Sequence, residues 1–316
     1  MKDTKFLSRL EKMPVPVLAT TVGAITLANY MQGLGFDWVR HVTTWAAIAV
    51  FLAYVAKMVI FPKTCVEEYN ITIPRSLYAG FSMILMAVSG YLLDYTPGFA
   101  KALWFTGIAI HACHILYFTY RTVIKDFSWD TFMPSWFVTY NGIMVSTVVG
   151  VGMNEPLIGK IIVYYGIAVY CIIMPFMIYR LATKKINVNF YHTQAIVLAP
   201  CSLCVTSYVN FIENKNMYLL GFLYICVLLS VLFIIIKLPK FFALPFTPGY
   251  AGLTFPMAIG TVASAKMAAV LGKMDYATLS NVVKQITGFQ FYLTTMLVGY
   301  VVLNFIMMLI KVKKPN

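Results

Sequence analysis

The sequence predicts an all-α integral membrane protein with ten transmembrane helices arranged as five helical hairpins. Of its 316 residues, 60% are hydrophobic and only 11% are charged, and the mean hydropathy is +0.79. Soluble domains carry roughly 25% charged and about 45–50% apolar residues. The apolar residues recur in blocks long enough to cross the roughly 30 Å hydrocarbon layer as helices. We expect a single transmembrane domain over residues 1–316, because no gap between blocks reaches the ~50 residues of a separate domain.

The predicted spans alternate between short and longer connections. They cover residues 15–35, 38–60, 74–94, 98–120, 134–154, 157–179, 193–213, 215–237, 249–271 and 288–310. The gap after each odd-numbered span is short, except after the ninth, and short links make neighbouring helices antiparallel. The first block is longer than the 7–15 residues of a signal-peptide core, so it is expected to be retained as a span. Short tails remain at 1–13 and 311–316.

Prolines recur at a nearly constant spacing in the odd spans. Pro14, Pro74, Pro134, Pro200 and Pro256 are separated by 60, 60, 66 and 56 residues. A fixed period of this kind marks a repeat architecture. Fourteen prolines would include some regular series by chance, but the alternation of hairpins gives the same period independently.

The odd and even spans differ in composition. The odd spans contain 28 Gly, Ser and Thr residues and the even spans contain 14. Small residues let helices approach closely, and hydroxyls can face water or a polar substrate. A solid interior would explain this as well. We favour a quasi-fivefold ring with odd helices inside, even helices outside and a pathway on the axis. Residues that could line this pathway are Gly23, Ser82, Gly142, Ser146, Ser202, Thr206 and Gly260.

Lysine and arginine are distributed unevenly between the two sides of the predicted bundle. Seventeen of the 24 lie in the terminal segments, in the connections after even spans, or near the span ends that adjoin these connections. Positive residues are retained on the cytoplasmic side, so both termini are expected to be cytoplasmic in an inner or plasma membrane. The net charge of +13 therefore needs no nucleic-acid partner. The basic tails are expected to meet anionic lipid headgroups.

All eleven acidic residues fall in loops or at span ends. Carboxylates inside a membrane typically mark proton relays and cation sites, since a charge at the midplane costs roughly 2.5–3.5 kcal/mol or more. Their absence from the span interiors argues against a proton pump built on buried Asp or Glu. A neutral pathway with a positive cytoplasmic mouth suits an anion. A bundle without any transport role would also lack buried charges, so the pattern indicates the sign of the substrate more than transport itself.

Thr254-Phe255-Pro256 lies inside the ninth span. A proline there removes a backbone donor and forces a bend. In a bilayer such a break survives only where it is buried in protein or lines a cavity. Small residues surround the Phe255 ring, so the ring could act as a plug, although core packing would also explain it.

Candidate chemical sites elsewhere in the chain are few. His111 and His114 share one helical face and could hold a metal or part of a haem site, but their span is even and no carboxylate lies nearby in sequence. Cys201 and Cys204 form a CxxC within an apolar helix without a second ligand pair, which favours packed thiols. No Gly-rich phosphate loop, GxSxG or HExxH is present. The sequence predicts neither an enzyme nor a cofactor.

Three stretches resemble the tellurite-resistance/dicarboxylate transporter family: Gly-Leu-Thr-Phe-Pro-Met at 252–257, Pro-Ser-Trp-Phe at 134–137 and Leu-Ala-Pro at 198–200. The family includes bacterial tellurite-resistance membrane proteins, yeast malate and sulfite transporters, and plant slow anion channels. The resemblance implies a homotrimer in which each protomer has its own pore, lined by the five odd helices. It also implies that Phe255 occludes this pore. Cys201 departs from the family, whose members often carry a second proline after Pro200.

The sequence therefore predicts an anion channel or transporter that passes small anions through a central pore. Phe255 is the predicted gate, and Thr254 and Pro256 would set the position of its ring. An exporter or uptake transporter of sulfite, tellurite-type oxyanions or C4-dicarboxylates is the alternative within transport. A membrane redox or metal-binding protein using His111 and His114 is the alternative from another class.

Overall fold

The computed structural model describes residues 2–310, and within this range every regular element is helical. The elements in order are α1 (Lys2–Glu11), α2 (Pro16–Gln32), α3 (Asp37–Ile60), α4 (Pro62–Asn70), α5 (Thr72–Leu77), α6 (Ala79–Leu92), α7 (Pro97–Phe118), the π-helix η1 (Thr119–Lys125), α8 (Trp136–Tyr140), η2 (Gly142–Met144), α9 (Val145–Val149), η3 (Gly150–Met153), α10 (Pro156–Thr183), η4 (Val188–Val197), α11 (Leu198–Phe211), α12 (Met217–Phe242), η5 (Pro248–Leu253), α13 (Thr254–Lys273) and α14 (Ala277–Ile310). The elements η2 to η5 are 3₁₀ helices.

Seven helical stretches are long and apolar enough to cross a membrane within the described residues. An eighth results if α4 and the α5–α6 stretch, which meet at 107°, form one broken span. The two predicted spans that remain coincide with α2, which has only 17 residues, and with the short helices of residues 136–153. The chain is therefore an all-helical, multi-pass membrane protein.

Burial divides these helices into two sets. In the most apolar 18-residue stretch of each helical segment, 83% of the residues are buried in Val188–Phe211 and 67% in Pro248–Lys273. The buried share lies between 22% and 39% in the helices at the even positions, which are α3, α7 with η1, α10, α12 and α14. Most residues of α2 and α6 are also buried. The segments rich in small residues thus form the interior, where close helix packing needs them.

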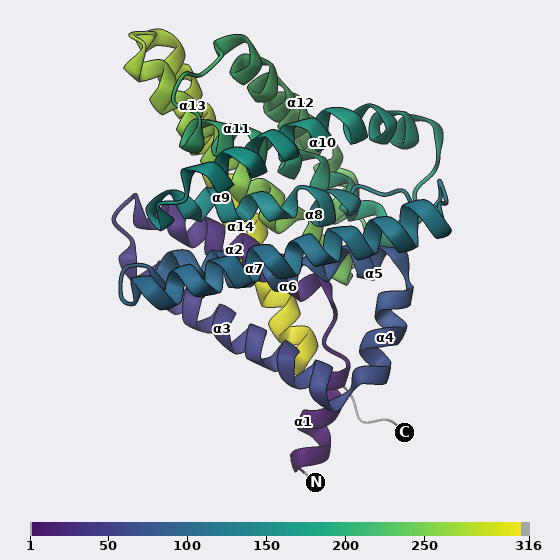
Figure 1. Cartoon of the computed structure of the whole chain (residues 1–316). Helices are drawn as coiled ribbons and strands as arrows, with labels where there is room; N and C mark the ends of the chain where they lie inside the picture. The colour runs from purple at the N-terminus through teal and green to yellow at the C-terminus, as the bar shows by residue number, and fades with distance from the viewer. Residues whose placement is uncertain (1, 311–316) are drawn as a thin grey trace.

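The buried segments are broken, and the exposed ones are long. In Figure 1, α7 and α10 cross the view as long helices, whereas α8 and α9 are short pieces. The chain before Pro256 changes from 3₁₀ geometry in η5 to α geometry in α13, and a bend at this proline stays a prediction. Pro256 is the third residue of α13, where its missing N–H removes no intrahelical hydrogen bond.

The two ends of the described chain lie together. The Arg9 guanidinium donates a hydrogen bond of 3.0 Å to the carbonyl of Ile310, and Figure 1 shows α1 beside the yellow end of α14. Helix α14 begins at Ala277, eleven residues before the predicted tenth span. The predicted span covers only the apolar block, whereas the helix also includes the more polar residues that precede it. The predicted basic tail at 311–316 lies outside the described residues.

Candidate functional site

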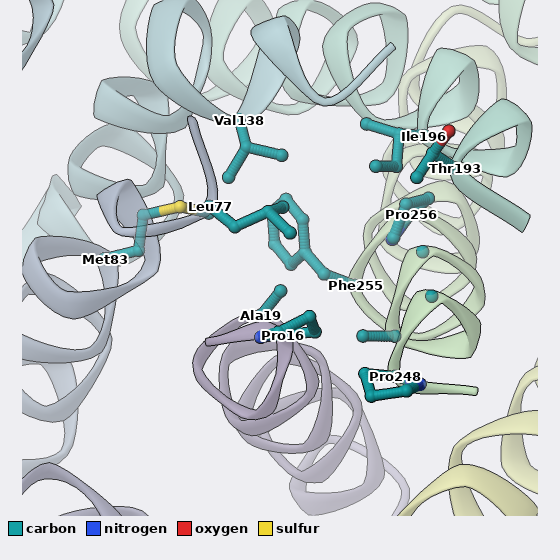
Figure 2. A pocket seen from close by; sticks show the side chains of 13 residues that line it. Pro16, Ala19, Leu77, Met83, Val138, Thr193, Ile196, Pro248, Phe255 and Pro256 are labelled. Carbon is teal, nitrogen blue, oxygen red and sulfur yellow. The ribbon is translucent and has the colours of Figure 1, made fainter. Parts of the chain in front are cut away.

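Phe255 lies at the start of α13 and is only 5% exposed. Figure 2 shows its ring projecting from α13 toward Leu77, Val138 and Ala19, which belong to three other segments. The hydroxyl of Thr254 donates to the carbonyl of Ala251 at 2.7 Å and so ties the first turn of α13 to η5. The ring is therefore held by a short, well-bonded turn rather than by a loop.

A small cavity lies on one side of the ring. Its volume is about 30 Å³, which leaves room for only one or two water molecules. Its walls come from all five of the segments at odd positions, and they are almost entirely apolar. The lining residues are Pro16, Ala19, Leu77, Met83, Val138, Thr193, Ile196, Pro248, Gly249, Ala251, Gly252, Phe255 and Pro256.

A large cavity of about 490 Å³ lies on the other side. It is lined near the ends of α2, α6 and α9 and along α13, and Arg40 of α3 also reaches it. Among the described residues, Phe255 is the one that the two linings share. The lining residues are Thr26, Asn29, Tyr30, Gln32, Gly33, Leu34, Arg40, Ala87, Gly90, Val145, Val148, Val149, Phe255, Val262 and Lys266.

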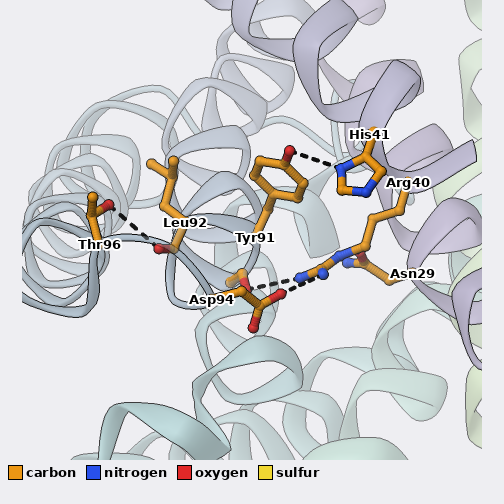
Figure 3. A network of polar contacts seen from close by, with 8 residues as sticks. Asn29, Arg40, His41, Tyr91, Leu92, Asp94 and Thr96 are labelled. Atoms are coloured by element: carbon orange, nitrogen blue, oxygen red, sulfur yellow. Dashed lines mark hydrogen bonds and ion pairs between the residues drawn. The ribbon is translucent and has the colours of Figure 1, made fainter. Parts of the chain in front are cut away.

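Arg40 is the first of two cationic side chains in the large cavity. Its guanidinium pairs with the Asp94 carboxylate at 2.5 Å and donates to the Asn29 side chain and the Gly90 carbonyl, each at 3.1 Å (Figure 3). These contacts tie α3 to the ends of α2 and α6. Its charge is largely compensated by Asp94, so Arg40 chiefly fixes the shape of the cavity.

Lys266 is the second cationic side chain, and it forms no ion pair or hydrogen bond within residues 2–310. It is partly buried in α13. Phe255, Val262 and Lys266 follow one another at helical spacing, so all three face the same cavity. Lys266 lies about 16 Å along the helix from the ring. An uncompensated ammonium group in this position makes the large cavity positive.

The chain matches the sequence profile of the family described as voltage-dependent anion channel over residues 13–310. The protein belongs to this family. No curated protein matches it. The family match, together with the apolar helices, makes the protein a membrane anion channel or transporter, and it confirms the family resemblance expected from the motifs around Phe255.

The seven residues of this protein that were predicted to line a pore lie where helices contact one another. All seven are buried, and none of them is among the residues lining the two cavities. Ser82, Ser146 and Ser202 donate their hydroxyls to carbonyls of their own helical turns. Their role as pore lining stays a prediction. Arg40 and Lys266 were not among the predicted site residues, although the spacing of Lys266 from Phe255 was a usable signal.

Gly23 brings α2 against the start of α13. A Cβ atom at this position would lie 2.5 Å from the backbone nitrogen of Phe255 and 2.9 Å from the Cβ of Thr254. Backbone atoms cannot move aside as a flexible side-chain end can. The absence of a side chain at Gly23 therefore sets the position of the turn that carries the Phe255 ring.

Replacing Gly23 by alanine is expected to destabilise the protein by about 1–3 kcal/mol, because the added methyl group overpacks a backbone contact. The measurement is the thermal unfolding midpoint of the purified protein in detergent. Gly221→Ala in α12 is the matched control, since a Cβ there meets nothing within 4 Å. Equal midpoints for the two variants would show that α2 does not constrain α13.

The two histidines considered for metal or redox chemistry have structural partners. His111 contacts the Ser82 hydroxyl and the Thr139 carbonyl, each at 2.8 Å, and His114 contacts the Tyr69 hydroxyl at 2.9 Å and the Thr139 hydroxyl at 3.3 Å. All four ring nitrogens are thus engaged in hydrogen bonds. Nothing in this arrangement favours a redox centre, and the described residues contain no group of three or more metal-ligating side chains.

Proposed function

We propose that the protein conducts small anions passively along an axis between its buried helices, with the Phe255 ring closing the path. The observation that carries this proposal is that Phe255 alone borders both cavities. The small cavity adjoins the starts of the odd segments, on the side predicted to be cytoplasmic, and the large cavity adjoins their other ends. A path that joins the two must pass the ring.

The proposed architecture is a quasi-fivefold ring. The inner ring consists of α2, α5–α6, α8 to η3, η4–α11 and η5–α13, and the even-numbered helices surround it. The high burial of the inner segments supports this arrangement, as does the contribution of all five to the small cavity. Both chain ends are proposed to be cytoplasmic, and a homotrimer remains the assembly that the family resemblance implies.

The path is proposed to be closed in this conformation. Beside the ring, the walls include Ala19, Leu77, Val138 and Ile196, and the space is about 30 Å³. An anion that loses its water in such an apolar constriction receives no compensating contacts. Hydrophobic constrictions gate channels in this way. Rotation of the ring into the large cavity would join the two spaces and open the path.

The preference for anions is proposed to come from the large cavity. Within residues 2–310 the structure shows no carboxylate in the lining of either cavity, and Lys266 contributes an uncompensated positive charge. A cleft with one sign of charge and low-dielectric walls concentrates ions of the opposite sign. The cavity would thus fill with anions on one side of the ring.

Anion flux into liposomes across a panel of inorganic and carboxylate anions tests this function. A channel is expected to pass several small anions in proportion to the voltage and to ignore a pH gradient at zero voltage. Protein-free liposomes provide the baseline. Flux of sulfite or dicarboxylates that requires a pH gradient would replace the channel by a coupled transporter, and the absence of flux for every anion would contradict both.

A further inference from the structure

A cleft of about 510 Å³ at the ends of α10 and α12 collects four lysines. Lys184 and Lys185 follow α10, whereas Lys237 and Lys240 lie in the last turns of α12. The remaining lining is Leu181, Ala182, Thr183, Ile186, Tyr191 and Gln194. Among the described residues no carboxylate lines the cleft, so four like charges face a common space without a counter-charge from this part of the chain. Such an arrangement favours a multiply charged anion.

The cleft is held in shape by specific contacts. The Arg180 guanidinium donates to the Lys184 carbonyl at 3.0 Å and to the Trp129 carbonyl at 2.6 Å, which fixes the chain that carries the first two lysines. Lys237 donates to the Tyr191 hydroxyl at 3.4 Å, and the Lys240 ammonium lies 4.8 Å from the centre of the same ring. Tyr191 thus contacts two of the four cations with one aromatic side chain.

The surroundings of the cleft favour a lipid as the carrier of the anionic group. Ile178 lies six residues before Lys184, Ile236 directly precedes Lys237, and the two isoleucines are 60% and 67% exposed. Acyl chains could pack on these side chains while the headgroup occupies the cleft. The cleft also lies on the side of the bundle predicted to be cytoplasmic, where anionic lipids attract basic residues.

The helix η4 connects this cleft to the Phe255 site. Tyr191 and Gln194 line the lysine cleft, whereas Thr193 and Ile196 line the small cavity. The intervening His192 stacks on Tyr250 of η5 with ring centres 3.7 Å apart. Ten residues of 3₁₀ geometry form a weakly bonded element, and such stretches often mark functional hinges.

Two glycines of η5 bring its backbone against η4. A Cβ at Gly252 would lie 2.8 Å from the His192 carbonyl oxygen, and one at Gly249 would lie 3.0 Å from the Asn189 carbonyl oxygen. A displacement of η4 therefore cannot be absorbed at this contact. Since Phe255 follows η5 by two residues, the displacement reaches the ring.

We propose that the lysine cleft binds a phosphate monoester group, carried by a lipid headgroup or a soluble molecule, and that its occupancy opens the path at Phe255. The phosphate draws Lys237 and Lys240 away from Tyr191, which loosens η4 against α12 although His192 keeps its contact with the Phe241 carbonyl. The wall formed by Thr193 and Ile196 then retreats from the ring. Binding of the phosphate is inferred from the cleft alone. The coupling of this binding to Phe255 rests on the proposed channel function.

Native mass spectrometry of the delipidated protein tests the binding step. The ligands are short-chain phosphatidylinositol bisphosphate, inositol trisphosphate and short-chain phosphatidylcholine. We expect the phosphoinositide to bind, phosphatidylcholine to bind much more weakly, and K237Q/K240Q to bind the phosphoinositide about 30-fold more weakly than the wild type. The matched control K63Q/K125Q removes the same charge from exposed lysines outside the cleft and is expected to bind normally.

The arms of this experiment separate the sources of the phosphate. Equal affinities for inositol trisphosphate and the lipid would show that a soluble molecule can supply the phosphate. Tight binding of the lipid alone would show that a lipid headgroup supplies it. Wild-type affinity in K237Q/K240Q, or equal binding of phosphatidylcholine, would overturn the site.

Anion flux in liposomes tests the coupling step. The phosphoinositide is expected to raise wild-type flux about fivefold and to leave K237Q/K240Q unchanged. Phe255→Ala is expected to conduct with or without the lipid. Normal lipid binding without a change in wild-type flux would overturn the coupling and leave the site intact. Failure of Phe255→Ala to conduct would instead contradict the gate, which distinguishes the two proposals.

Discussion

Replacing Phe255 by alanine is expected to raise anion conductance about tenfold or more, because the ring is the group that separates the small cavity from the large one. Removing it leaves two small residues, Ala19 and Gly252, beside the opening. An anion can then keep part of its hydration shell through the constriction. The measurement is macroscopic anion current in planar bilayers at matched amounts of reconstituted protein.

A comparably buried phenylalanine outside the constriction provides the control. Phe305 of α14 is 4% exposed and packs edge-on against Phe246 at 5.5 Å, away from both cavities. Phe305→Ala loses a similar amount of buried surface and should lower stability without raising conductance. A folded Phe255→Ala variant with wild-type conductance would show that the ring is a packing residue only.

Reversing the charge at Lys266 is expected to lower the anion-to-cation permeability ratio about tenfold at low ionic strength. The change replaces the uncompensated positive charge of the large cavity by a negative one beside the same path. Reversal potentials under a salt gradient measure the ratio. The effect should shrink in concentrated salt, where the Debye length falls to about 3 Å at 1 M.

Lys284→Glu is the matched control for this prediction, since Lys284 lies on the exposed surface of α14 and lines neither cavity. It alters the net charge of the protein by the same amount and should leave the ratio unchanged. Equal ratios in Lys266→Glu and the wild type would remove Lys266 from the selectivity mechanism. A neutral Lys266→Gln variant should give an intermediate ratio if the effect is electrostatic.

The lysine at position 266 also shows what sequence reasoning missed. It falls within the predicted ninth span but is not among the seven residues predicted to line the pathway. Its spacing from Phe255 matches one helical face, which the sequence alone displays. The sequence does not show whether this helical face contacts another helix or a cavity.

The apolar blocks, their alternation and the Gly, Ser and Thr content of the odd spans were determined by the sequence itself. These features depend on local composition and spacing, and the buried and exposed helix sets follow from them. The family resemblance also depended on short contiguous motifs, and the match over residues 13–310 confirms it.

The rotation of each helix was decided only by the tertiary structure. In a membrane protein nearly every face of an inner helix is apolar or small, so periodicity rarely singles out the face toward a cavity. Gly23 is an example: it was predicted to line a pathway, but it faces the backbone of α13 at Phe255, where two helices contact each other. Phe255 could be named from its motif, but its position between two cavities required five segments, distant in sequence, to converge on one ring.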